Sequence, residues 1–115
     1  MPDISPVSIS AADTYRFDIF IAGDVETAKA ICRKYCFKVG LCVTVEPVSF
    51  IYTGGEETGV RIGLINYPRF PKTEDEIRDQ AHALGLELME GLFQLSFSVV
   101  DPDRTEWVSR RPAAD

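Results

Sequence analysis

The sequence has few of the residues from which catalytic and metal centres are usually built. It contains one histidine and three cysteines in 115 residues. An odd number of cysteines without a scaffold-like spacing does not predict a disulfide framework, so we expect free thiols in a reducing compartment. Basic residues are also scarce, since 12 Lys and Arg stand against 18 Asp and Glu, a net charge of −6. A negative net charge repels phosphate backbones, which argues against direct nucleic-acid binding.

Long apolar runs are missing as well. No stretch approaches the length of a membrane span, and the first 13 residues have neither a basic segment nor a continuous apolar core of the kind found in secretory signals. We therefore expect a cytoplasmic protein without a membrane partner.

The residues that are present are enough for one domain. Apolar residues make up 45% of the chain, which can bury a core without metal or disulfide crosslinks. We predict a flexible N-terminal arm over residues 1–13, a single domain over residues 14–109, and a C-terminal tail over residues 110–115. The arm is predicted from its prolines, serines and lack of periodicity.

Residues 41–67 form the most conspicuous stretch and predict a long β-hairpin. Two runs rich in Val, Ile, Thr, Phe and Tyr flank Gly54-Gly55-Glu56-Glu57, where glycine accepts positive φ. Pro47 cannot donate to a strand ladder, so it predicts a bulge or an edge position in the first arm.

The flanking segments predict further strands and two helices. Alternating apolar residues predict strands over residues 15–21 and 95–100, and residues 104–109 a short edge strand. A helix is expected from the Asp24 N-cap to Gly40. A second helix is expected from the capping box of Thr73 and Glu76 to about Gly91.

The element order is therefore strand, helix, strand, strand, helix, strand. This order resembles the ferredoxin-like β-α-β-β-α-β sandwich, an α+β fold in which two helices cover one face of an antiparallel sheet. The resemblance is to a fold, spans residues 14–100, and identifies no site because many functions use this architecture.

The loop over residues 66–71 is the first candidate binding site. It combines Tyr67, Arg69 and Phe70, residue types that are enriched at recognition sites, between two prolines that limit the entropy lost on binding. The alternative is that Tyr67 and Phe70 merely fasten the second helix to the sheet. Arg61 and Tyr52 in the hairpin are further candidate binding residues.

The uncovered face of the sheet is the second candidate surface. If Phe17, Ile19 and Ile21 point at the helices, then Arg16 and Phe20 point away from them. We expect Phe50 and Tyr52 to join them in an interface with a second copy of the chain or another protein.

The cysteines and the histidine give weaker signals. Cys32, Cys36 and Cys42 with His82 would make a metal site only if they converged, and we expect the thiols to pack in the core instead. His82 lies off the apolar stripe of its helix and has no evident partner, so we expect it to face solvent. The sequence thus predicts no catalytic residues, no metal and no cofactor.

Three functions are compatible with these features. The first hypothesis is a protein-interaction module that self-associates through the open sheet face or an edge strand, which favours a non-enzymatic role and a homodimer. The second is a small-molecule-binding protein or enzyme with a pocket near residues 66–71. The third is an acidic inhibitor that occupies the nucleic-acid-binding surface of a partner, and it requires one cluster of Glu56, Glu57, Glu74, Asp75 and Glu76.

Overall fold

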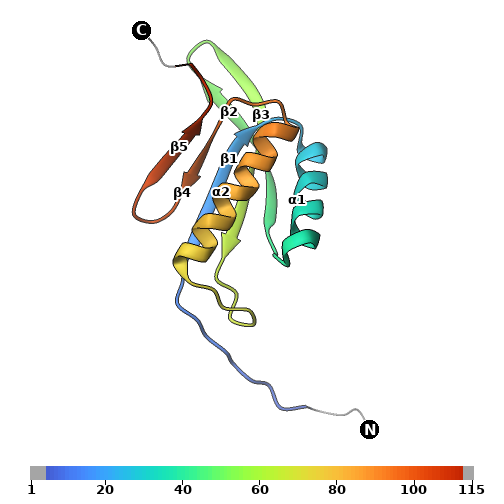
Figure 1. Cartoon of the computed structure of the whole chain (residues 1–115), viewed down its shortest axis with the longest axis vertical. Coiled ribbons are helices and arrows are strands. Elements are labelled where there is room, and N and C mark those ends of the chain that lie inside the picture. The colour runs from blue at the N-terminus through green and yellow to red at the C-terminus, as the bar shows by residue number, and fades with distance from the viewer. Residues whose placement is uncertain (1–4, 113–115) are drawn as a thin grey trace.

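The computed structural model describes residues 5–112, and within them the predicted order of elements is observed. The strands and helices are β1 (Arg16–Ala22), α1 (Val25–Val39), β2 (Thr44–Tyr52), β3 (Gly55–Ile65), α2 (Glu74–Gly91), β4 (Ser96–Val100) and β5 (Thr105–Ser109). Figure 1 shows α1 and α2 in front of the strands, with the N-terminal segment leaving the domain at one end. The extra C-terminal edge strand, β5, is present as predicted.

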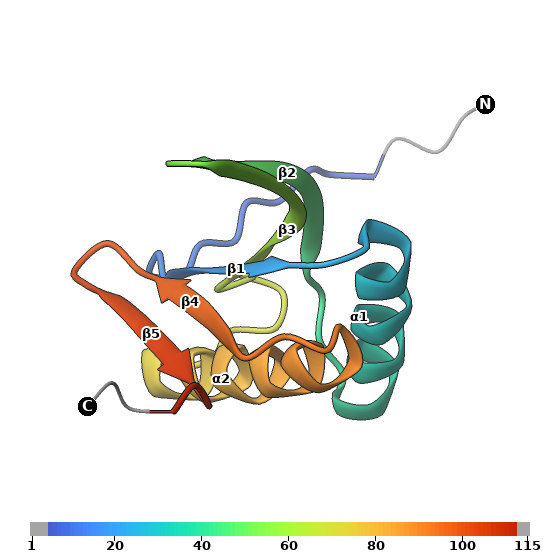
Figure 2. The same ribbon diagram turned by 90° about the horizontal axis from the view of Figure 1, so that it is seen from above.

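The strands form one five-stranded antiparallel sheet in the order β2-β3-β1-β4-β5. The fold is therefore α+β, with a five-stranded antiparallel sheet and two helices. Ile19, near the middle of β1, lies opposite Ile62 of β3 on one side and Val99 of β4 on the other. Seen from above, both helices lie on the same side of the sheet, and the outer part of the β2–β3 hairpin curls away from them (Figure 2).

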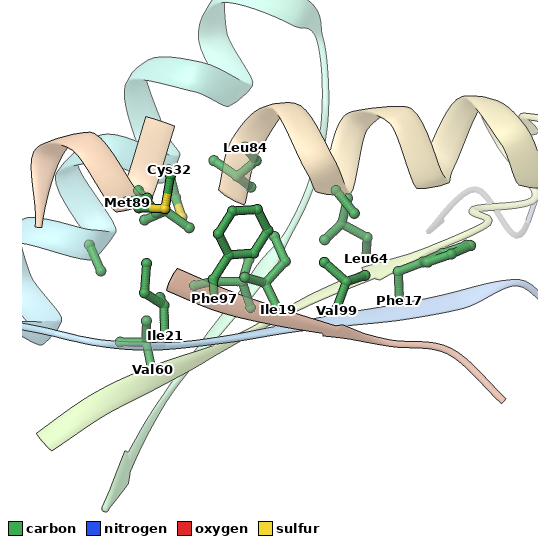
Figure 3. Close-up of a cluster of buried hydrophobic side chains, with 14 of the residues drawn as sticks. Phe17, Ile19, Ile21, Cys32, Val60, Leu64, Leu84, Met89, Phe97 and Val99 are labelled. Carbon is green, nitrogen blue, oxygen red and sulfur yellow. The ribbon is translucent and has the colours of Figure 1, made fainter. Parts of the chain in front are cut away.

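The core lies between the helices and the face of the sheet turned towards them. The alternating residues of β1, Phe17, Ile19 and Ile21, are at most 2% exposed, as their spacing predicted. Figure 3 shows Ile19 and Ile21 on the side of the sheet that faces Leu84 and Met89 of α2, with Phe17 further along β1. The remaining buried apolar residues include Ala28, Cys32, Tyr35, Val60, Ile62, Leu64, Ile77, Ala81, Leu88, Leu92, Phe97 and Val99.

Two details of the strands differ from the sequence prediction. The hairpin turns at Thr53-Gly54, because Tyr52 already pairs with Gly55 and Gly54 takes a φ of +87°. Glu56 belongs to strand β3, so it is not part of the connection. Leu95 precedes β4 and is 47% exposed.

The helix ends follow the predicted signals. Asp24 accepts a hydrogen bond from the Thr27 amide at 2.9 Å, and Gly40 ends α1 with a φ of +73°. Thr73 and Glu76 form the complete capping box at the start of α2. Pro47 occupies a sheet edge without a bulge, since β2 is an outer strand in continuous register. Within residues 5–112, neither helix is long and apolar enough to cross a membrane.

The ends of the chain are only partly described. Residues 5–15 contain no helix or strand, and residues 1–4 and 113–115 lie outside the described part. The flexible arm, the domain limits at residues 14 and 109, and the C-terminal tail thus stay predictions.

Asp101 is the buried charge that holds the turn between β4 and β5. Its carboxylate, 3% exposed, accepts hydrogen bonds from the Asp103 and Arg104 amides at 2.8 and 2.9 Å and from Arg78 of α2 at 3.1 Å. Burial raises the pKa of Asp101, but these hydrogen bonds and the two arginines outweigh burial, so its pKa lies below the ordinary 3.8. The anionic form therefore stabilises the fold at neutral pH.

We expect Asp101→Asn to lower the free energy of unfolding at pH 7 by about 1–3 kcal/mol, because Arg78 loses its buried partner. Because the pKa of Asp101 is lower in the folded protein, its ionised carboxylate stabilises the fold above pH 3.8. This stabilisation is lost as the pH falls through the folded-state pKa. The wild type should therefore lose stability between pH 5 and pH 2 more steeply than the variant, as measured by urea unfolding. Asp103→Asn, at an exposed position, is the control, and equal slopes for Asp101→Asn and wild type would contradict the assignment.

Candidate functional site

A cavity of about 530 Å³ lies where the end of α1, the loop before α2 and the first half of α2 meet. Figure 1 shows these segments at the same end of the domain. Its walls are mostly apolar, and they are lined by Cys36, Gly40, Leu41, Cys42, Ile65, Tyr67, Arg69, Phe70, Lys72, Ile77 and Gln80. Three of the five binding residues predicted from the sequence, Tyr67, Arg69 and Phe70, therefore lie around one cavity.

Asn66 fixes the loop that forms one wall of the cavity. Asn66 is only 9% exposed. Its side-chain amide donates to the Asp13 carbonyl at 2.8 Å, and its side-chain oxygen accepts from the Lys72 amide at 2.8 Å. The loop is closed further by the Phe70 amide, which donates to the Tyr67 carbonyl at 2.9 Å. Asn66 thus holds the two ends of the loop together and positions the side chains between them.

Tyr67 and two cysteines form the wall nearest α1. The Cys42 thiol lies 3.5 Å from the Tyr67 hydroxyl. The hydrogen bond with Cys42, together with burial, raises the pKa of Tyr67 above 10.0. Burial, followed by the nearby Cys42, raises the pKa of Cys36 above 9.0. Tyr67 and Cys36 are therefore neutral at pH 7 and act as hydrogen-bonding and polarisable groups.

Gln80 supplies a polar group from α2. Its side-chain oxygen, Oε1, is buried and has no hydrogen-bond partner among the described residues. A buried acceptor without a donor costs about 1–3 kcal/mol. Gln80 lines the cavity, but this oxygen is itself closed off from solvent, so the Gln80 side chain must rotate for the oxygen to accept from a ligand donor.

The lining of the cavity carries positive charge. Arg69 and Lys72 belong to the lining, which contains no aspartate or glutamate. The Arg69 guanidinium lies 5.1 Å from the centre of the Phe70 ring, a cation–π distance. Phe70 is 63% exposed, so the prediction that it fastens α2 to the sheet is wrong.

The two other predicted binding residues lie elsewhere. Arg61 of β3 donates to Asp18 at 3.0 Å, and its guanidinium lies 5.9 Å from the centre of the Phe20 ring. Tyr52, 54% exposed, lies at the hairpin tip. Neither lines the cavity at the end of α1.

The predicted interface residues lie on the open side of the sheet or at its tip. Phe20 and Phe50 are half-buried and border a smaller hollow of about 150 Å³, together with Trp107. Arg16 is exposed and borders another hollow beside Asp101. Their role in an interface stays a prediction.

The cysteines and the histidine depart from expectation. Cys32 packs in the core and burial raises its pKa to about 12, but Cys36 is half-buried and Cys42 is exposed. The core-packing prediction is therefore wrong for Cys42, which lies in the linker between α1 and β2. Within residues 5–112, no three His, Cys, Asp or Glu side chains are placed to hold a metal ion.

His82 has a partner that the sequence did not reveal. Its Nε2 lies 3.1 Å from the Glu106 carboxylate of β5, and its side chain is 33% exposed. The expectation of a solvent-facing histidine without a partner is thus wrong, because β5 folds back beside α2. His82 does not line the cavity.

The acidic residues do not form one cluster. Glu56 and Glu57 lie next to the hairpin tip, whereas Glu74, Asp75 and Glu76 start α2 at the other end of the domain (Figure 1). This arrangement lacks the single acidic surface that the inhibitor hypothesis required.

Lys72 and Gln80 of the cavity lining were not predicted from the sequence, and Asn66 was included only as part of the 66–71 loop, without a role of its own. Asn66 and Lys72 flank the prolines of the loop, but nothing local shows that they bond to each other. Gln80 precedes Ala81 of the apolar stripe and reads as an ordinary polar helix residue. A polar residue directly beside a buried stripe was the only available signal.

Fold and site together define a small α+β protein with a ligand-sized, largely apolar cavity at one end of its two helices. No family model matches the sequence, and no curated protein matches it. The fold is similar to that of a phage SAM lyase in complex with S-methyl-5'-thioadenosine, with a TM-score of 0.70, 16% identity, and coverage of 91% of this chain and 96% of that one. A phage SAM lyase in the apo state is similar at a TM-score of 0.70 and 18% identity, over 87% of this chain and 92% of that one.

These comparisons correct the first functional hypothesis. At 16% and 18% identity they show a shared fold. The proteins that share it are lyases, and one of them holds a small molecule, so the prediction of a protein-interaction module is contradicted. The alternative, a small-molecule pocket near residues 66–71, agrees better with both the fold and the cavity.

We expect Asn66→Ala to loosen the loop and to reduce the free energy of unfolding by about 1–3 kcal/mol, because two hydrogen bonds of a buried side chain are lost. The specific readout is hydrogen exchange of the Lys72 amide, which should become faster. Asn66→Asp keeps the acceptor for this amide and loses the donor to Asp13, so it should retain more protection at Lys72. Unchanged Lys72 exchange in Asn66→Ala would show that Asn66 does not hold the loop.

Proposed function

We propose that this protein binds a small molecule that contains an adenine nucleoside with a sulfur substituent, in the cavity beside residues 66–71. The observation that carries the proposal is a largely apolar cavity of ligand size lined by Gln80, whose buried Oε1 lacks a hydrogen-bond partner among the described residues. Concave, mostly apolar sites with a few convergent polar groups are the usual form of small-molecule sites. The ligand class is supported by S-methyl-5'-thioadenosine in the phage SAM lyase of similar fold.

The chemistry of Gln80 suits an adenine ring. An amide side chain pairs with adenine by accepting from its exocyclic amine and donating to a ring nitrogen. Gln80 Oε1 lacks a donor among the described residues, and the adenine amine supplies one. Binding would thus remove the cost of the unpaired oxygen, which gives the ligand an advantage over an apolar molecule of the same shape.

The remaining walls suit a purine and a thioether. Tyr67 and Phe70 supply aromatic surface, while Leu41, Ile65 and Ile77 supply aliphatic surface. Planar purines stack on aromatic side chains, and sulfur makes favourable contacts with aromatic rings. The neutral Tyr67 hydroxyl is available to hydrogen-bond a ribose hydroxyl.

Binding ranks ahead of catalysis in this proposal. The cavity lining contains neither a carboxylate nor a histidine, the groups that most often act as general bases. Tyr67 and Cys36 keep their protons at neutral pH because their pKa values are raised. The lining therefore supports holding and orienting a ligand, and an enzymatic role would rely on orientation more than on proton transfer.

Three finer expectations from the sequence stay part of the proposal. The position of β1 between β3 and β4, with antiparallel pairing throughout, supports a ferredoxin-like fold. Free Cys32, Cys36 and Cys42 support a reducing, cytoplasmic compartment. Exposed Trp107, at 63%, supports a homo-oligomer or a protein partner.

We expect S-methyl-5'-thioadenosine to bind the protein in isothermal titration calorimetry, and Gln80→Leu to weaken this binding about tenfold, equivalent to about 1.4 kcal/mol. Leucine fills a similar volume without the unpaired oxygen, so the Tm of the ligand-free variant should equal or exceed that of wild type. Weaker binding with an undiminished Tm separates a binding role from a folding defect.

Phe70→Ala should also weaken binding, whereas Phe37→Ala should leave it unchanged. Phe37 is a matched control because it is 93% exposed on α1 and does not line the cavity. Absence of binding by the wild type at millimolar ligand would refute the proposed ligand class. Wild-type affinity in Gln80→Leu would refute the cavity as its site.

A further inference from the structure

We infer that the adenine nucleoside bound in this cavity also carries an anionic group on the side away from its adenine ring, so that an adenine nucleoside with such a group binds more tightly than a neutral one. The inference rests on the proposed function and names the substrate class of the same site. Its basis is the pair Arg69 and Lys72, which face a cavity without a carboxylate in its lining.

Arg69 and Lys72 are available for a ligand. Neither forms an ion pair with another residue in the described range 5–112, so both side chains are free to meet a ligand. The chain as a whole has a net charge of −6, so two unpaired cations at one cavity run against its overall charge. Such a local positive field favours an anionic ligand group.

No neighbouring group in the cavity lining neutralises the positive charge of Arg69 and Lys72. Tyr67 and Cys36 are neutral at pH 7, as their raised pKa values imply. The acids at the start of α2 do not line the cavity. Among them, Glu74 is paired with Arg78 at 3.2 Å, and Glu76 accepts from the Thr73 amide.

The anion would be bound by side chains and not by the start of α2. The Thr73 hydroxyl already accepts from the Glu76 amide at 3.1 Å, and the first turn is acidic. Arg69 offers several donors in a planar fork, and Lys72 offers a point charge, a combination that suits phosphate or carboxylate oxygens. The backbone of Lys72 is fixed by its hydrogen bond to Asn66, which reduces the ordering cost of binding.

The spacing of the polar groups matches a ligand that is polar at both ends. Gln80 lies eight residues beyond Lys72, and the six steps of α2 from Glu74 to Gln80 correspond to roughly 9 Å of helix rise. A ligand that bonds to Gln80 with its adenine amine therefore reaches the loop cations with the substituent on its ribose. A nucleoside 5'-phosphate has its charge at this end, whereas a sulfonium there would meet two positive charges.

The test compares adenosine 5'-monophosphate with adenosine, which differ only in the phosphate, by calorimetry on the full chain. We expect the monophosphate to bind at least tenfold more tightly, because a hydrogen bond to a charged group contributes about 1.5–3 kcal/mol. The ratio should fall as salt is raised, since the cations are near the surface. The ratio of the two affinities should fall to about one in the double variant Arg69→Gln/Lys72→Gln. The control Lys34→Gln removes an exposed cation outside the cavity and should leave the ratio unchanged.

The outcomes of this test distinguish the anionic ligand group from the proposed binding of an adenine nucleoside. Equal affinities for adenosine and its monophosphate would overturn the inference and leave the proposed function standing. A ratio that persists in the double variant would also overturn it, because the phosphate would then be held elsewhere. Failure of adenosine, its monophosphate and S-methyl-5'-thioadenosine alike to bind would overturn the proposed function itself.

Discussion

The pairing of β1 with β3 on one side and β4 on the other is the constraint on which the structure depends. It places Phe17, Ile19 and Ile21 on one fully buried row. A sheet with one apolar face needs a cover, and the apolar stripes of α1 and α2 supply it. The sheet order follows from this pairing, since β2 and β5 are left as the two outer strands.

The cavity lies where α1, one of the two helices that cover the sheet, ends. α1 stops at its left-handed Gly40 cap, and the chain then leaves the helix through Leu41 and Cys42 before β2 begins. The end of α1, the end of β3 at Ile65 and the first half of α2 surround the space that remains. The loop held by Asn66 forms a further wall, which leaves a hollow lined mostly by apolar residues.

Much of the fold was predictable because its signals are local. Alternation in β1, the Asp24 cap and the capping box of Thr73 and Glu76 each act within a few residues. The hairpin turn was displaced to Thr53-Gly54 because its position depends on cross-strand pairs such as Tyr52 with Gly55, which no local signal specifies.

The site was predictable only in part, for the same physical reason. Tyr67, Arg69 and Phe70 stood out by residue type on a proline-bounded loop. Gln80, Lys72 and Cys42 did not, because they acquire their role when three segments distant in sequence converge. The prediction that Cys42 packs in the core was wrong for the same reason, since the burial of a linker residue depends on which distant segments pack over it.

We propose that the ligand occupies the cavity between the 66–72 loop and α2, and chemical-shift mapping of the 15N-labelled protein with S-methyl-5'-thioadenosine locates the bound ligand. We expect the largest shifts at the Gln80 side-chain amide and at the backbone amides of Tyr67, Phe70 and Lys72. Shifts concentrated instead around Phe20, Ser98 and Trp107 would place the ligand on the open face of the sheet and contradict the account.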